Sequence, residues 1–248
     1  MKRLLIFFWV LSPLLGDQVK QEKRADVALC IVATGDYIDY AKDLIQSSRT
    51  HFLKRHSLTY IVFSDRPIDA ANDIVQVPIT RRGWPYDSMG RFEIMLNHAD
   101  LLEGYDYIFC SDADMLMVDA INEEILGDLV AVQHPGFIDG GGTFETNRDS
   151  TAFTPSHLQK VYYCGGFYGG KLPQLKKLWE KTSININQDL KKGIVAIWHD
   201  ESHINCFLAH NPPSVTLSSA YCFTEAWPLP YPKKIIAIDK DHEALRQL

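Results

Sequence analysis

The chain has 248 residues and a formal net charge of −6, so it can bury the core of one large domain and has no basic footprint for nucleic acid. Its five cysteines are odd in number and include no Cys-x-x-Cys pair. This usage indicates reduced, buried thiols and argues against a disulfide framework or a cysteine-based zinc site.

The first residues have the pattern of a leader. Lys2 and Arg3 precede the apolar stretch 4–15, which is typical of a signal sequence but short for a membrane-spanning helix. A cleaved signal, a short anchor and an interfacial helix are all open alternatives. We expect a leader at 1–16, a polar spacer at 17–26 and one catalytic domain at 27–248. This organisation predicts membrane association, with a secreted or cytoplasmic-face location as alternatives.

Strand and helix patterns alternate through the first half of the chain. Residues 27–33 are apolar on both faces, as in a buried parallel strand. The other predicted elements are strands at 57–63, 73–78, 105–110 and 129–134 and helices at 37–53 and 89–102. Such alternation indicates α/β architecture. Because ligands of open α/β sheets bind beyond the carboxyl ends of the strands, the loops after Ala33, Cys110 and Val132 should converge.

Two carboxylates follow the predicted strand 105–110. Asp112 and Asp114 stand one residue apart, so their side chains project to the same side of an extended or tightly turned segment. They can hold a hard divalent cation and leave positions for phosphate oxygens. Nucleotide-sugar transferases need such a site, because the cation neutralises the departing diphosphate. Alone, an Asp-x-Asp pair more often marks a solvated loop start.

The segment 198–205, Trp-His-Asp-Glu-Ser-His-Ile-Asn, holds two histidines and two carboxylates. His199 and His203 have the i, i+4 spacing of zinc ligands, but a zinc hydrolase needs its Glu directly after the first His, where Asp200 stands. A second alternative is structural, with Asp200 or Ser202 capping a helix through Leu208.

Five segments in the same order resemble the histo-blood-group ABO and α-1,3-galactosyltransferase family, glycosyltransferase family 6. They are 112–114, 134–137, 162–170, 198–205 and 217–221. The resemblance spans roughly residues 27–246, and the short spacer is typical of a bacterial-type member. It implies a GT-A type nucleotide-sugar transferase fold with a mixed central sheet flanked by helices. It further implies Mn²⁺ and retaining α-1,3 transfer of N-acetylgalactosamine (GalNAc) or galactose (Gal) from a UDP-sugar to a galactose-terminated glycan.

The resemblance also assigns roles to individual residues. Glu201 matches the catalytic glutamate, Asp112 and Asp114 match the metal ligands, and His203 is expected to be a structural hydrogen-bonding residue. The positions that match donor-binding residues are Ala33, Thr34, Gly35, Tyr37, Arg91, Asp112, Ala113, Asp114, Cys164, Gly165, Gly166, His199, Asp200, Lys240 and Arg246.

Donor and acceptor choice rest on fewer residues. Cys164 and Gly166 occupy the positions that the family associates with the sugar's 2-substituent, and Gly166 leaves room for an acetamido group, which favours UDP-GalNAc over UDP-Gal. On the acceptor side, His134 is kept and Thr224 and Glu225 are the candidate partners. The family's Trp-Asp pair reads Phe223-Thr224 here, so an acceptor-gripping carboxylate is missing. Two alternatives therefore stay open: a catalytically weak glycan- or UDP-binding protein, and a metal-dependent UDP-sugar hydrolase.

Overall fold

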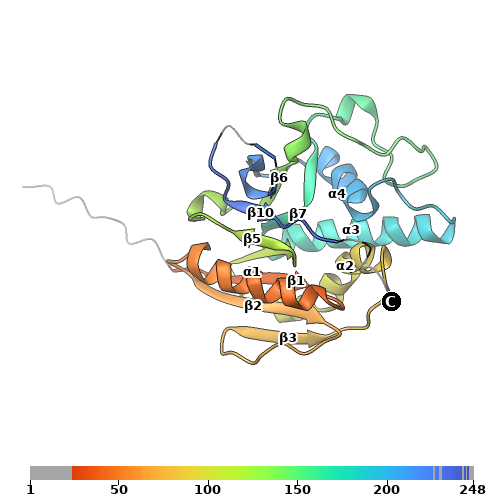
Figure 1. Cartoon of the computed structure of the whole chain (residues 1–248). Helices are drawn as coiled ribbons and strands as arrows, with labels where there is room; N and C mark the ends of the chain where they lie inside the picture. The colour runs from red at the N-terminus through yellow and green to blue at the C-terminus, as the bar shows by residue number, and fades with distance from the viewer. Residues whose placement is uncertain (1–23, 226, 229–230, 242, 244, 246–248) are drawn as a thin grey trace, which may run out of the picture.

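The computed structural model describes residues 24–225, 227–228, 231–241, 243 and 245. Its centre is a seven-stranded sheet with the order β3-β2-β1-β4-β7-β6-β8 (Figure 1). These strands are β1 (Asp26–Val32), β2 (Ser57–Ser64), β3 (Ile74–Pro78), β4 (Tyr107–Asp112), β6 (Leu129–Gln133), β7 (Tyr163–Gly170) and β8 (Val215–Leu217). Strands β1 to β4 are parallel, whereas β7 runs antiparallel to β4 and β6. The predicted α/β architecture with a mixed central sheet is confirmed.

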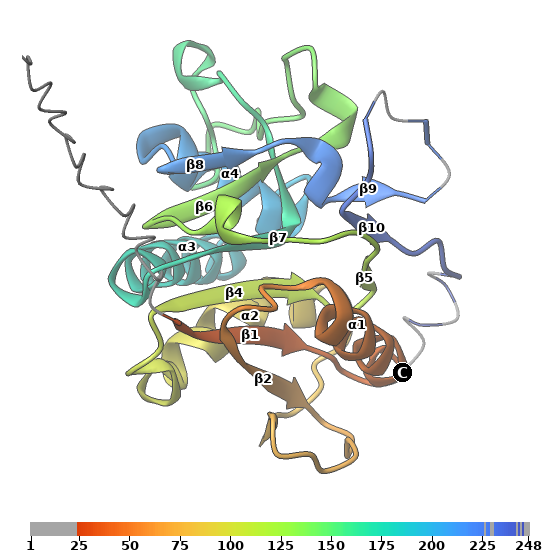
Figure 2. The same ribbon diagram turned by 90° about the vertical axis from the view of Figure 1, so that its left-hand side faces the viewer.

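Helices cover both faces of this sheet (Figure 2). Helix α1 (Tyr37–His51) packs on one face, and α2 (Tyr86–Asn97), α3 (Leu172–Lys191) and α4 (His199–His210) pack on the other. The side chains of β1 alternate between the two cores: Leu29 and Ile31 pack with α1, whereas Ala28 and Cys30 pack with α2 and α3. This two-residue alternation explains why β1 is apolar on both faces.

A small second sheet leads the end of the chain back to the acidic pair. Strand β5 (Met115–Met117) starts directly after Asp114 and pairs with β10 (Ile235–Ala237), which also pairs with β9 (Phe223–Thr224). The backbone N–H of Ile238 donates to the carbonyl oxygen of Asp114 at 2.9 Å. The residues after β10 therefore lie at the end of the central sheet where β4 stops.

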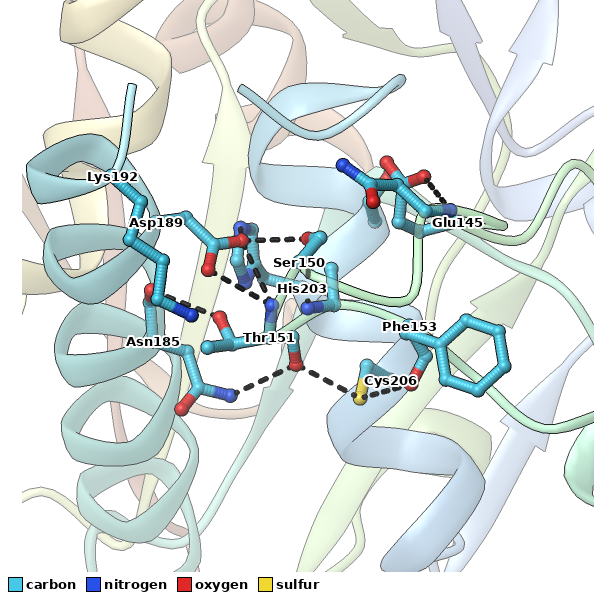
Figure 3. Close-up of polar contacts among 12 residues, drawn as sticks. Glu145, Ser150, Thr151, Phe153, Asn185, Asp189, Lys192, His203 and Cys206 are labelled. Atoms are coloured by element: carbon cyan, nitrogen blue, oxygen red, sulfur yellow. Dashed lines mark hydrogen bonds and ion pairs between the residues drawn. The ribbon is translucent and has the colours of Figure 1, made fainter. Parts of the chain in front are cut away.

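Buried polar contacts fasten the loop 144–154 to α3 and α4 (Figure 3). Asp189, 1% exposed, accepts hydrogen bonds from Ser150 Oγ at 2.6 Å and from Thr151 N at 2.9 Å. His203 Nε2 lies 3.8 Å from the same carboxylate, and burial lowers the pKa of His203 to about 4. His203 is therefore a buried, neutral imidazole in a packing network, and its Nδ1 has no hydrogen-bond partner among the described residues, so the expected hydrogen-bonding role is not seen.

The predicted elements are confirmed with shifted ends. The helix predicted at 89–102 is instead α2 followed by a separate 3₁₀ helix, Ala99–Leu102, and the strand predicted at 105–110 runs from Tyr107 to Asp112. Strand β7 and helix α3 were not predicted. Glycine has a low strand propensity, and four of the eight residues of β7 are glycines. Residues 1–16 and most of the spacer lie outside the described residues. Within the described part of the chain, no helix combines the length and apolarity that a membrane span requires.

Candidate functional site

The carboxyl ends of β1 and β4, which are parallel neighbours, open onto a cavity of about 220 Å³. Its walls include seven of the predicted donor residues: Thr34, Tyr37, Arg91, Asp112, Ala113, Asp114 and Lys240. They also include Arg81, Trp84 and Asp87, which the sequence analysis did not single out. The exits of two neighbouring strands thus meet at one cavity, as the strand topology requires.

The exit of β1 is tied to the start of α2. Thr34 Oγ1 donates to Asp87 Oδ2 at 2.9 Å, and the N–H of Gly35 donates to Asp65 Oδ1 at 2.8 Å. Gly35 has a φ of 58°, and a Cβ atom there would lie 2.7 Å from Arg81 Nη1. Only glycine lets the backbone turn here while Arg81 packs against it.

Asp112, the last residue of β4, and Asp114, just after it, each contact a cationic side chain. Asp112 Oδ1 accepts from Arg91 Nη1 at 2.7 Å, and Asp114, 8% exposed, forms an ion pair with Lys240. The Lys240 ammonium also lies 5.7 Å from the ring centre of Tyr37. Ala113, between the two acids, is buried in the core.

This pair fits a divalent cation that binds together with an anionic ligand. Among the residues that the structure describes, no group of three or more His, Cys, Asp or Glu side chains could hold a metal ion. Asp112 and Asp114 can supply two carboxylates, and the oxygens of a diphosphate and water must complete the shell of a hard cation. A cation at Asp114 would take the place of the Lys240 contact.

Helix α4 begins with a sharp turn. His199 has a φ of 50°, and its ring centre lies 4.9 Å from that of Trp84. The N–H of Trp198 donates to Ser202 Oγ at 3.0 Å and closes the first turn. The helix of the structural alternative is present, with Trp198 at the N-cap position. Ser202 caps its first turn by accepting from the Trp198 N–H, whereas no such hydrogen bond is found for the Asp200 side chain among the described residues.

The zinc alternative does not fit the geometry. The His199 ring packs against Trp84 on the cavity wall, whereas His203 faces Asp189 in the buried network. The two imidazoles therefore have different neighbours despite their i, i+4 spacing.

Glu145 holds the backbone that leads into α4. This buried carboxylate accepts from the N–H of Ile197 and from the N–H of Asn147, each at 2.7 Å. The charge-assisted hydrogen bond from Ile197 fixes the turn before α4, and the one from Asn147 fixes the loop of Glu145 itself. Glu145 was not predicted, because its partners are backbone groups and Ile197 is far away in the chain.

Two carboxylates of α4 have raised pKa values. Glu201 Oε2 accepts from the N–H of Gly165 at 2.9 Å. Burial raises the pKa of Glu201 to about 7, although the Gly165 hydrogen bond opposes this rise. Burial also raises the pKa of Asp200 to about 6, against the pull of the Arg91 guanidinium 3.2 Å away. Both groups can therefore change protonation near neutral pH.

Arg91 joins the two acidic motifs. It contacts Asp112 and Asp200, and it donates to the carbonyl oxygen of Gly165 at 3.2 Å. Although burial opposes it, the two carboxylates raise the pKa of Arg91, so its charge is permanent. We expect Arg91→Met to lower the free energy of unfolding by about 3 kcal/mol, because it leaves two poorly solvated carboxylates without a counter-charge. Urea denaturation at pH 7.5 measures this loss.

A matched control is Arg82→Met. Arg82 pairs with Glu93 at 2.9 Å, but both side chains are largely exposed, so the loss should stay below about 1 kcal/mol. Equal losses for the two variants would contradict the central electrostatic role of Arg91.

Strand β7 brings bare backbone next to these acids. A Cβ atom at Gly165 would lie 3.6 Å from Asp200 Oδ2. A Cβ atom at Gly166 would lie 3.3 Å from Cys222 Sγ and 3.5 Å from Asp112 Oδ2. The two glycines let the backbone of β7 approach Asp112 and Asp200 closely.

His134 stands beyond β6 among aromatic rings. Its ring centre is 5.2 Å from that of Phe137 and 5.6 Å from that of Tyr162. Its Nδ1 accepts from the N–H of Gly136 at 3.0 Å, and burial lowers its pKa, so the neutral ring carries its proton on Nε2. Burial and the nearby Glu201 carboxylate raise the pKa of Tyr162. The Tyr162 side chain therefore lies between His134 and Glu201.

The other predicted acceptor residues, Thr224 and Glu225, lie at the end of β9, shortly before Trp227. Trp227, 48% exposed, lies beside the His134 loop, since a Cβ atom at Gly136 would be 3.9 Å from its ring. Just before it, Thr224 has a buried hydroxyl without a hydrogen-bond partner among the described residues, and Glu225 is exposed.

Of the other predicted donor residues, Ala33 and Cys164 are buried in the core. Arg246 is outside the described residues. The wall residues that were missed, Arg81, Trp84 and Asp87, follow β3. They could have been predicted from the rule that ligands bind beyond the carboxyl ends of parallel strands, because the segment after β3 also leaves such an end.

Comparison with known proteins supports this geometry. Residues 11–247 match the model of glycosyltransferase family 6. The rat histo-blood group ABO system transferase 1 is 31% identical over 94% of this chain and 72% of its own length. The human globoside alpha-1,3-N-acetylgalactosaminyltransferase 1 is 29% identical over 95% and 72%. The Escherichia coli O-antigen biosynthesis glycosyltransferase WbnI is 28% identical over 86% of this chain and 94% of its own length.

Proposed function

The chain belongs to glycosyltransferase family 6 and is a hexosyltransferase, and we propose that it catalyses retaining α-1,3 transfer from a UDP-sugar to a galactose-terminated glycan. The transferred sugar is proposed to be GalNAc, with Gal as the alternative. The observation that carries the proposal is the position of Arg91. This one guanidinium contacts Asp112 of the acidic pair and Asp200 of α4, beside Glu201. A diphosphate at the first motif would hold its sugar at the second.

We assign the donor-binding roles accordingly. Tyr37, at the exit of β1, is proposed to support the uracil ring, as an aromatic side chain on the cavity wall can. Lys240 and Arg91 would bring positive charge to the diphosphate. A divalent cation, proposed to be Mn²⁺ held by Asp112 and Asp114, would neutralise the leaving UDP as a Lewis acid.

Glu201 is proposed as the catalytic carboxylate. The bond between the anomeric carbon and the UDP oxygen breaks, and a bond to the acceptor O3 forms on the same face of the sugar. The acceptor's hydroxyl proton passes to the departing phosphate oxygen. Glu201 either attacks the anomeric carbon or stabilises the positive charge that develops there, and both roles require its ionised form.

The acceptor is proposed to bind beside His134. Its Nε2–H can donate to a sugar oxygen, and the exposed Trp227 ring offers an apolar face for a pyranose. Phe223 and Thr224 stand where the family has its Trp-Asp pair, and Glu225 follows at the next position. This departure supports a galactose-terminated glycan other than the fucosylated blood-group precursor. Membrane association through the leader also remains part of the proposal.

The test is a transfer assay with the full chain, Mn²⁺, a panel of β-galactosides and either UDP-GalNAc or UDP-Gal. Products are identified by mass and by the linkage found in nuclear magnetic resonance spectra. An α-1,3-linked product supports the proposal. Free GalNAc without any transfer product would point to a hydrolase, and UDP binding without turnover would point to a glycan- or UDP-binding protein.

A further inference from the structure

We propose that Asn205, the last residue of the polar segment 198–205, is a positioning residue for Glu201. Its side-chain amide holds the start of β7 in register with α4, so that the N–H of Gly165 meets the Glu201 carboxylate. The inference rests on the proposed function, because Glu201 is the proposed catalytic group. Asn205 itself is not a wall residue of the cavity, so it would act through Glu201 and not through contact with the donor.

Strand β7 loses its neighbours near its start. It pairs with β4 only from Phe167 onwards, and its pairing with β6 skips residues 165–167. Gly165 therefore has no ladder partner on either side among the described strands. Its N–H donates to Glu201 Oε2 at 2.9 Å, and its carbonyl oxygen accepts from Arg91 Nη1 at 3.2 Å. A bulge redirects backbone groups in this way, and here it directs them to the acidic centre.

Asn205 takes the place of a strand neighbour just before this bulge. The side chain, 1% exposed, accepts from the N–H of Tyr163 at 2.8 Å and donates to the carbonyl oxygen of Tyr163, also at 2.8 Å. Its Nδ2 donates in addition to the backbone carbonyl oxygen of Glu201 at 3.0 Å. One amide thus satisfies both backbone groups of a residue of β7 and ties them to the turn of α4 that carries Glu201.

The spacings of the helix and the strand match across this contact. Glu201 and Asn205 are one turn of α4 apart, which is about 6 Å along the helix axis. Tyr163 and Gly165 are two residues apart in an extended segment, which is about 6.6 Å, and their N–H groups point to the same edge. Two side chains of α4 therefore meet two N–H groups of β7. The Asn205 contact fixes the register, and the register places the Gly165 N–H at Glu201.

The Gly165 hydrogen bond affects how Glu201 ionises. Burial raises the pKa of Glu201, and the Gly165 N–H is the strongest opposing effect because it stabilises the charged form. Weakening this hydrogen bond should therefore raise the pKa of Glu201 further. An Asn205 variant leaves unchanged the other titratable side chains that act on this carboxylate, which are Tyr162, Asp200, Asp112 and Cys222.

Titration of Glu201 in Asn205→Ala tests the positioning without requiring turnover. The full chain is labelled with ¹³C at the glutamate carboxyl carbons, and the Glu201 resonance is assigned by its absence from Glu201→Gln. We expect the pKa of Glu201 to rise by about one unit from its native value of about 7, the scale of a lost hydrogen bond to a charged group. In transfer assays, kcat at pH 7 should fall at least about fivefold, and the Kd for UDP should stay unchanged.

Asn185→Ala is the matched control. Asn185 is a buried asparagine of α3 whose amide donates to the carbonyl oxygen of Thr151 at 3.4 Å, within the network of Figure 3. This variant should lower the melting temperature without moving the Glu201 titration. If Asn205→Ala also lowers only the melting temperature and leaves the Glu201 titration at its native midpoint, the positioning role is overturned.

A second variant is used if Asn205→Ala does not fold. Asn205→Thr is neutral and close in size, but its one hydroxyl donor cannot serve the carbonyl oxygens of both Tyr163 and Glu201. It should shift the Glu201 titration in the same direction by a smaller amount, and no shift would overturn the proposal.

The two readouts separate this inference from the proposed function. If the chain transfers neither sugar but the Glu201 titration moves in the Asn205 variants, the proposed function fails and the positioning role stands. If transfer occurs and the titration does not move, the proposed function stands and the positioning role fails.

Discussion

Glu201→Gln is expected to lower kcat for sugar transfer by a factor on the order of 10³, the scale of losing one preorganised stabilising group at the reacting centre. The amide keeps the shape of the side chain and can still accept from the Gly165 N–H, but it can neither attack the anomeric carbon nor balance a positive charge. Single-turnover transfer assays at saturating donor measure the loss. The Kd for UDP should stay unchanged, because Glu201 is not a wall residue of the cavity.

The pH dependence supplies a second check on Glu201. Since the ionised form acts and its pKa is about 7, kcat of the native enzyme should rise with pH through about 7 and then level off. The folded pKa lies above the ordinary value of 4.5, so folding stability falls as pH rises from about 4.5 through about 7 and stays lower above that. The Gln variant should therefore melt at or above the native temperature at pH 8 and lose this advantage near pH 4. A lower melting temperature at pH 8, or an active Gln variant, would contradict the assignment.

Asp114→Asn should lower transfer by about 10² to 10³-fold, and a chelator should lower transfer by the native enzyme to a similar degree, because a Lewis acid at the leaving group contributes several kcal/mol. Asp114 is the more buried acid, and its backbone is fixed by the Ile238 hydrogen bond. Transfer rates with EDTA and with added Mn²⁺ measure the effect. Electron paramagnetic resonance of Mn²⁺ in the presence of UDP reports the binding separately from activity.

Asp119→Asn is the matched control for Asp114. Asp119 carries an exposed carboxylate 3.9 Å from Lys234 on the same stretch of chain, so its variant should transfer normally. If EDTA does not lower the transfer rate of the native enzyme but Asp114→Asn does lower it, the metal assignment is wrong. The Lys240 ammonium, which already contacts Asp114, would then be the cation at the diphosphate.

The strands of the first half were predictable because their signals are local. Residues 27–33 are apolar on both faces, as in a buried parallel strand, and 57–63 end in the apolar run 60–63. Strand β7 gave no such signal, because four of its eight residues are glycines. Gly165 and Gly166 permit close approach to Asp200 and Asp112, and Gly169 and Gly170 permit close approach to Phe109 and the Asp128 backbone. Helix α2 ends at Asn97, earlier than predicted, because the apolar spacing continues into a separate 3₁₀ helix.

The two motifs of the candidate site were predictable, but the contacts that bring them together were not. Asp112 and Asp114 follow a recognisable strand, and Glu201 lies in a dense polar segment, so residue type and spacing identified each of them. No pattern indicated that Arg91 would contact both, or that Glu145 would hold the turn before α4 through the Ile197 N–H. Backbone partners leave no trace in side-chain spacing.

The sequence by itself therefore determined the α/β class, the acidic pair and the family. These depend on local periodicity and on motifs of a few consecutive residues. The tertiary structure alone decided which groups meet. Cys222 reaches Gly166 only because β9 pairs with β10 and β10 pairs with β5, the strand that follows the acidic pair. Likewise, the raised pKa values of Asp200 and Glu201 come from burial. Burial is set by how distant segments pack, and neighbours along the chain do not fix it.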